Sequence, residues 1–179
     1  EKIVSYRPEH VSLYSLTVEE NTPLGKLIES GNVSYDYDEA DRLWISGRDF
    51  LVKKGYRQYE VSNFCFPGFE CRHNLTYWRL QDYIGTGSGA TGTMYGKETE
   101  RWTNSRNISE YINFWLNSPY NAEKIPQVVE KIDEETQAFE FFMMGLRTTE
   151  GVSSIEYEKR FGRKMPKNAV SLFEQWEKC

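Results

Sequence analysis

The sequence predicts an α/β fold followed by a small helical module, and three observations lead to this prediction. First, strand-like apolar runs at 10–18 and 56–62 enclose a segment with helical spacing, an order that favours a parallel sheet. Second, residues 119–130 contain two prolines and no apolar period, which is typical of a linker. Third, the chain beyond the linker shows helix caps and no strand pattern. We therefore expect a domain at 1–118, a linker at 119–130 and a helical domain at 131–179.

The composition limits the class of protein. The chain has 179 residues, of which 39% are hydrophobic and 15% aromatic, too many for a disordered or collagen-like chain. The net charge of −5 disfavours nucleic acid or an anionic membrane surface as the main partner, because both attract basic proteins. Three cysteines make no disulfide framework, and no apolar run approaches the ~20 residues of a membrane span. With no visible signal peptide either, we expect a cytoplasmic protein without a membrane segment.

Local signals predict the elements of the first domain. Residues 1–6 read as the tail of a helix, so we expect the chain to be a fragment of a longer protein. The run 10–18 is apolar on both faces, as in a buried parallel strand, and should lie at a sheet edge or pair with another molecule. N-cap residues and closing glycines predict helices over 22–31 and 36–55. Further expected elements are strands at 56–62 and 82–85, a hairpin at 93–103 and a helix at 107–116.

The last part of the chain carries three helix signatures. Asp133 and Ser153 are expected N-caps of helices over 134–147 and 154–161, and a third helix is expected at 168–176. Three short helices with a tight second turn are typical of a helix-turn-helix or winged-helix module. A nucleic-acid-binding module is therefore an alternative function, although the acidic balance of this segment argues against binding to a phosphate backbone.

The densest group of chemically capable side chains lies at 71–79, inside a long polar and aromatic connection at 63–81. Its candidates are Arg72, His73, Asn74, Tyr77, Trp78 and Arg79. An imidazole can bind an iron axially, aromatic rings can lie against a flat macrocycle, and arginine forks suit propionate carboxylates. The alternative is a loop held by aromatic packing, in which His73 is hydrogen-bonded within the protein.

Two further segments are weaker candidates. Residues 59–64 end a predicted strand, where ligands bind in barrels and open α/β sheets, although turns at strand ends favour the same residue types. The glycines of 85–89 are spaced GxGxG and not GxGxxG, so they indicate a tight turn or a close ligand approach and disfavour a dinucleotide site. Tyr14 and Leu16 fit the buried core of a strand. The sequence contains no GxSxG, P-loop or HExxH motif.

A series of motifs follows one another with a familiar spacing. They are YEVSNF at 59–64, PGFECRHNLTYW at 67–78, DYIGTGSGA at 82–90, FFMMGLR at 141–147, EGV at 150–152 and RFG at 160–162. In order and spacing they resemble the oxygen-independent coproporphyrinogen III oxidase family of radical S-adenosylmethionine (SAM) proteins. The HNxxYW signature at 73–78 is similar to the heme chaperone branch of that family.

This resemblance implies an incomplete (β/α) radical SAM barrel followed by a small helical, winged-helix-like domain, of which this chain covers only the C-terminal part. In full-length members it implies S-adenosylmethionine and a [4Fe–4S] cluster held by a CxxxCxxC loop. This sequence lacks that loop, so we expect no cluster and no bound cofactor in this chain. Carried over by position, the resemblance makes His73 the candidate ligand of a heme iron. It also makes Tyr14, Leu16, Ile84 and Gly85 candidate SAM contacts.

For function, the resemblance implies heme binding and delivery, with heme or porphyrin and a heme-acceptor protein as partners. The enzyme alternative is an oxidoreductase of porphyrin biosynthesis that converts propionates of coproporphyrinogen III to vinyl groups. Without the cluster loop, this chain alone is expected to be inactive in radical chemistry. No nucleic acid is expected, and self-association through an exposed sheet edge is a further prediction.

Overall fold

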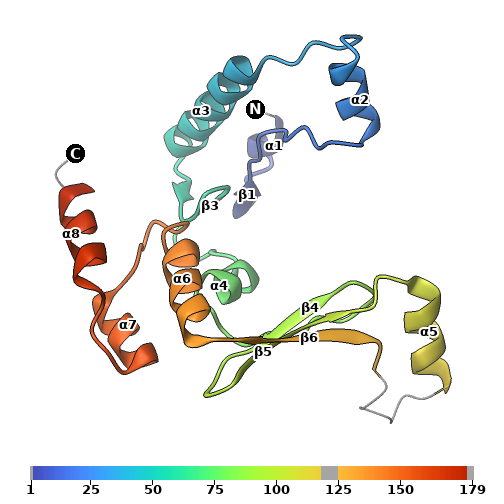
Figure 1. Cartoon of the computed structure of the whole chain (residues 1–179). Helices are drawn as coiled ribbons and strands as arrows, with labels where there is room; N and C mark the ends of the chain where they lie inside the picture. The colour runs from blue at the N-terminus through green and yellow to red at the C-terminus, as the bar shows by residue number, and fades with distance from the viewer. Residues whose placement is uncertain (1, 118–124, 177–179) are drawn as a thin grey trace. The chain divides into compact units, whose positions relative to one another are not determined.

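The computed structural model describes residues 2–117 and 125–176 (Figure 1). The chain forms two compact units, 1–71 and 72–179. The division falls inside the predicted first domain, directly before the segment that carries the HNxxYW signature. Half of the predicted linker at 119–130, namely 119–124, lies outside the described residues. No described helix combines the length and apolar character that are needed to cross a bilayer.

The first unit mixes short strands with helices. In chain order these are α1 (Lys2–Ser5), β1 (His10–Ser12), α2 (Pro23–Glu29), α3 (Tyr37–Lys53), β2 (Arg57–Gln58) and β3 (Asn63–Cys65). The predicted caps of α2 and α3 are confirmed: Thr22 Oγ1 accepts from the Gly25 N–H and Asp36 Oδ1 accepts from the Glu39 N–H, each at 3.0 Å. These bonds satisfy backbone donors that have no partner within the first turn of a helix.

The sheet of the first unit is antiparallel, so the predicted parallel pairing is wrong for these strands. Its order is β1–β3–β2. The Tyr59 N–H donates to the Asn63 carbonyl at 3.1 Å, which closes a tight turn and sends the chain straight back. The second predicted strand therefore becomes a hairpin. β1 spans only His10–Ser12, and it lies at an edge of this sheet as predicted.

The core of the first unit forms where α3 packs on this sheet. Leu51, Tyr56 and Phe64 are buried together, and Phe66 stacks on Tyr56 with ring centroids 4.4 Å apart. The Tyr56 hydroxyl donates to the Pro8 carbonyl at 2.6 Å, so this ring is held at both its apolar body and its polar tip. Among the residues whose spacing predicted α3, Leu51 is buried in this core, whereas Leu43 is 63% exposed.

The second unit contains a longer sheet and most of the helices. Its elements are α4 (Arg72–Trp78), β4 (Thr91–Met94), β5 (Thr99–Asn104), α5 (Ile108–Asn117), β6 (Gln127–Ile132), α6 (Glu134–Gly145), α7 (Ser154–Phe161) and α8 (Lys167–Trp176). The predicted hairpin and the predicted helix before the linker are confirmed as β4–β5 and α5. α4 was not predicted, because its polar and aromatic sequence was read as a connection.

The sheet of the second unit runs β4–β5–β6 with every pairing antiparallel (Figure 1). β6 occupies 127–132, which overlaps the end of the predicted linker at 119–130 and the start of the predicted helical domain, and all six of its residues pair with β5. The strand predicted at 82–85 is wrong: Tyr83 makes only an isolated bridge to Thr93. The mixed α/β class is confirmed, and the described residues close no barrel.

The C-terminal helices follow their predicted caps. Asp133 Oδ1 accepts from the Thr136 N–H at 2.7 Å and Ser153 Oγ from the Glu156 N–H at 3.3 Å. Gly162 ends α7 in the left-handed conformation, with φ of 64°. Their buried core consists of Ala138, Tyr157 and Met165, with Phe141, Phe142 and Phe161 in ring contact with Tyr157.

Candidate functional site

The predicted site residues lie on α4 and directly after it. Residues four apart on a helix share a face, so α4 pairs His73 with Tyr77 and Asn74 with Trp78. The helix ends at Trp78; Leu80 in the following turn adopts a positive φ of 47°, and the Gln81 N–H reaches back to the Thr76 carbonyl at 2.9 Å. The HNxxYW signature is therefore distributed over two faces of one short helix.

His73 and Tyr77 form a direct pair on an exposed face of α4. The Tyr77 hydroxyl lies 3.2 Å from His73 Nε2, and the two rings meet edge to face with centroids 5.0 Å apart. No described residue bonds His73 Nδ1. When Nε2 carries the proton and donates to Tyr77, Nδ1 presents a lone pair to solvent. The arrangement leaves one ring nitrogen open, as a metal ligand requires.

Trp78 and Arg79 line a cavity of about 690 Å³ within the second unit. Phe141 of α6 and Lys159 and Arg160 of α7 form other parts of its wall. The Trp78 indole N–H is buried and has no hydrogen-bond partner among the described residues. This cavity joins the end of α4 to the C-terminal helices, and His73 is not among its lining residues.

Arginine side chains hold the end of α4. Arg79 forms an ion pair with Glu150 in which one guanidinium nitrogen, Nη2, lies 2.9 Å from each carboxylate oxygen. The Arg160 guanidinium donates to the carbonyls of Arg79 and Leu80 at 3.1 and 3.0 Å, and Arg147 lies over the Trp78 ring at 5.1 Å. Arg79 is thus committed to a carboxylate of this chain.

Arg72 differs from Arg79 in that it has no described partner. Its side chain is exposed and makes no hydrogen bond or ion pair with the described residues. It stands at the first position of α4, next to His73. Of the two arginines predicted to meet propionates, only Arg72 has a guanidinium without a described carboxylate partner.

Of the four candidate SAM contacts, three are exposed, and the fourth, Gly85, packs against the backbone of Thr91. Tyr14 and Leu16 follow β1 in an irregular segment and are 70% and 55% exposed, so the expectation that they form a strand core is wrong. Ile84 is 73% exposed. A Cβ on Gly85 would stand 2.3 Å from the Thr91 carbonyl oxygen, so this glycine is explained by a close backbone approach.

The glycine-rich segment 85–89 is a turn fastened to β5. The Asn104 side-chain amide donates to the carbonyls of Gly85 and Gly87 at 3.3 and 2.9 Å. Gly87 and Gly89 have φ values of 110° and 72°, which L-residues rarely adopt. Of the two readings, a tight turn and a ligand approach, the geometry accounts fully for the first.

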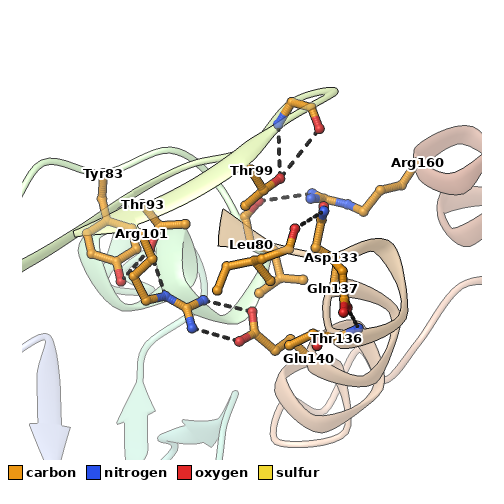
Figure 2. A network of polar contacts seen from close by, with 12 residues as sticks. Leu80, Tyr83, Thr93, Thr99, Arg101, Asp133, Thr136, Gln137, Glu140 and Arg160 are labelled. Atoms are coloured by element: carbon orange, nitrogen blue, oxygen red, sulfur yellow. Dashed lines mark hydrogen bonds and ion pairs between the residues drawn. The ribbon is translucent and has the colours of Figure 1, made fainter. Parts of the chain in front are cut away.

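A buried polar group next to α4 was missed from the sequence. Arg101 of β5 and Glu140 of α6 form a bidentate ion pair, and Thr93 and Tyr83 extend it (Figure 2). The hydrogen bonds that Arg101 donates to Glu140 raise the pKa of Arg101, and burial together with the charge of Glu140 raises the pKa of Tyr95. The available signal was a charged residue at an inward position of the predicted hairpin.

The described residues include no group of three histidine, cysteine or acidic side chains placed to hold a metal ion. Cys65 is buried, and burial together with the negative charge of Glu70 raises the pKa of its thiol. Cys71 is partly exposed. The donor set of a radical SAM cluster is therefore not found in the described part of this chain.

Comparison with known proteins gives three findings. The family model of the HemN C-terminal domain matches residues 132–166. A heme chaperone HemW from Synechocystis is 33% identical over 82% of this chain and 34% of its own length, and one from Escherichia coli is 34% identical over 86% and 38%. A solved structure described as coproporphyrinogen III oxidase (HemN) from Escherichia coli, a radical SAM enzyme, superposes with a TM-score of 0.63 at 12% identity. It covers 90% of this chain and 38% of that one.

The chain spans little more than a third of the length of these relatives. The structural likeness confirms the fold expected from the motifs. The curated relatives belong to the heme chaperone branch that the HNxxYW signature resembles. The chain belongs to the family of the heme chaperone HemW, and its residues 132–166 match the HemN C-terminal domain.

Proposed function

We propose that this chain takes part in heme binding and delivery, with His73 as the axial ligand of the heme iron. The observation that carries the proposal is the His73–Tyr77 pair, an exposed imidazole with one nitrogen engaged and the other open. Its support from comparison is that the curated relatives are heme chaperones. Heme is cargo in this proposal, and the acceptor is a further protein.

Each candidate residue receives a role from its place on α4. Iron binding at Nδ1 requires Nε2 to keep its proton, and the Tyr77 hydroxyl then accepts that proton's hydrogen bond. Arg72, at the neighbouring position and without a described carboxylate, would meet a propionate. Asn74 and Trp78 share the other face, and Trp78 with Arg79 would hold the helix against the C-terminal helices.

The SAM and cluster chemistry of the family is not assigned to this chain. The sequence has no CxxxCxxC loop, and the described residues offer no set of three metal ligands. Tyr14, Leu16, Ile84 and Gly85 remain proposed SAM contacts of the longer family members. No step of the proposed function depends on them.

A hemin titration followed by the Soret band tests the proposal. His73→Ala should lose the absorption of a histidine-bound heme while its far-UV circular dichroism stays unchanged. His10→Gln is the matched control, since His10 is the other histidine and its Nε2 lies 2.9 Å from the Tyr59 hydroxyl. A His73→Ala protein with the spectrum and affinity of the parent would refute axial ligation by His73.

The enzyme alternative is oxidation of coproporphyrinogen III. Its support is the fold shared with HemN, which at 12% identity reaches no further than the fold. The two functions differ in one observable: an oxidase turns over porphyrinogen, whereas a chaperone binds heme and passes it on unchanged. Turnover of porphyrinogen by a longer protein that contains this chain would favour the oxidase.

A further inference from the structure

A continuous set of contacts leads from the HemN C-terminal domain to His73. It begins at Glu140 of α6, which is buried and receives two hydrogen bonds of 2.8 Å from the Arg101 guanidinium (Figure 2). Two parallel bonds fix the plane of the guanidinium as well as its position. The third guanidinium nitrogen, Nε, is thereby aimed at a single acceptor.

That acceptor is Thr93, which lies opposite Arg101 in the β4–β5 ladder. Arg101 Nε donates to Thr93 Oγ1 at 3.1 Å, and Thr93 Oγ1 donates in turn to the Tyr83 hydroxyl at 3.1 Å. Thr93 is fully buried. Because the arginine is always a donor, the threonine proton must point away from it, and the order of donors in this group is fixed.

Tyr83 is held to Thr93 by its backbone as well. The Tyr83 N–H donates to the Thr93 carbonyl at 3.0 Å, and the Thr93 N–H donates to the Tyr83 carbonyl at 2.9 Å. With the hydroxyl bond, three hydrogen bonds join these two residues. These three hydrogen bonds therefore hold Tyr83, including its ring, in a fixed position next to Thr93.

The Tyr83 ring meets Tyr77 edge to face, with centroids 4.7 Å apart and an interplanar angle of 72°. Tyr77 contacts His73 by its ring and by its hydroxyl. Tyr77 thus lies between a fixed tyrosine and the exposed imidazole. A rotation of its ring would move the hydroxyl away from His73 Nε2.

We propose that Tyr83, Thr93, Arg101 and Glu140 are positioning residues that hold Tyr77 and thereby set the orientation and tautomer of His73. The proposal rests on the proposed function, in which His73 binds the heme iron. It gives α6, part of the matched HemN C-terminal domain, a task in heme binding: Glu140 stabilises the ligand's partner through residues that do not touch heme.

Three variants of the full chain test this proposal. Thr93→Val keeps a β-branched side chain on the strand and removes only the hydroxyl between Arg101 and Tyr83. Tyr83→Leu removes the ring that contacts Tyr77. Glu98→Gln is the matched control, since it breaks the exposed ion pair with Lys131 in the same sheet and touches none of the positioning residues.

The first readout is the nitrogen NMR spectrum of the histidine side chains in heme-free protein. With only two histidines in the chain, His10→Gln assigns both sets of signals. Thr93→Val and Tyr83→Leu should shift the His73 nitrogen signals toward the average of two tautomers, and Glu98→Gln should leave them unchanged. The second readout is hemin affinity, which we expect to fall about tenfold or more in both variants, as for other partners of metal-bound histidine.

Parent-like His73 signals and parent-like hemin affinity in a folded Thr93→Val protein would overturn the proposal, even if Tyr83→Leu fails to fold. The two proposals fail separately. If His73→Ala leaves hemin binding unchanged, axial ligation is refuted, while the heme-free spectra still decide whether these residues orient His73. If His73→Ala abolishes the ligand spectrum and Thr93→Val changes nothing, only the positioning role is refuted.

Discussion

At the scale of single residues, the chemistry of α4 depends on which ring nitrogen of His73 carries the proton. Tyr77 is the described partner of Nε2, and when its hydroxyl accepts from the ring it favours the tautomer with the proton on Nε2. Tyr77→Phe keeps the edge-to-face ring contact and removes the hydroxyl. We expect hemin affinity to fall about tenfold while the Soret band keeps the position of a histidine-bound heme.

The same titration with Tyr83→Phe provides a comparison for Tyr77→Phe. That variant also loses one phenol hydroxyl in the same aromatic group, but the hydroxyl that it loses bonds Thr93 and not His73. A larger loss of affinity in Tyr83→Phe than in Tyr77→Phe would contradict a direct role for the Tyr77 hydroxyl.

The two described cysteines should differ in reactivity. Cys65 is fully buried in β3, and burial with the nearby Glu70 charge raises the pKa of its thiol, so little reactive thiolate forms. Cys71 is partly exposed. In mildly alkaline buffer, iodoacetamide should modify Cys71 first and Cys65 only in unfolded protein, as measured by peptide mass spectrometry. Equal rates at the two thiols in native protein would contradict the burial of Cys65.

At the scale of elements, α7 depends on its N-cap. Ser153 Oγ accepts the Glu156 N–H, and no residue of the helix itself can satisfy this donor. Ser153→Ala should lower the free energy of unfolding by about 1 kcal/mol in a urea titration. Ser153→Asp supplies another capping acceptor and should retain most of the stability; a loss as large as that of alanine would show that capping is not the cause.

Helices were predictable from the sequence because their ends carry local chemistry. Asp36, Asp133 and Ser153 each accept a hydrogen bond from a backbone N–H three residues ahead, so both partners lie within one short segment of the sequence. Strand partners are set by distant segments. The turn at 59–62 reverses the chain where a continuing strand was expected. β6 follows a proline-containing stretch and forms a strand by pairing with the edge of β5.

The candidate site was predictable in its residue types and not in its geometry. His73 and Tyr77 stood out as a motif, but their common face follows only once 72–78 is known to be helical. The proposed role of Glu140 depends on its ion pair with Arg101, which is 39 residues earlier in the chain. No local sequence pattern indicates a contact over that separation. The sequence therefore indicates the proposed ligand, His73, but not the residues that we propose to position it.

At the scale of the whole molecule, the described residues form one hydrophobic core in each of the two units. One surrounds Leu51, Tyr56 and Phe64, and the other surrounds Ala138, Tyr157 and Met165. Phe64→Ala should cost about 3–5 kcal/mol, and this loss should speed amide hydrogen exchange in the first unit while α6 and α7 keep their protection. Met165→Ala should give the converse pattern. Faster exchange across both units in either variant would mean that the chain unfolds as one cooperative body.

The boundary between the units falls at 71/72, immediately before α4. The partners described above for His73, Tyr77, Trp78 and Arg79 all belong to residues 72–179. The HNxxYW signature and the matched HemN C-terminal domain therefore lie in one structural unit, with consequences for recombination. A recombination event at this boundary would exchange the preceding segment without separating the proposed ligand from the side chains that orient it, whereas one inside 73–140 would break them apart.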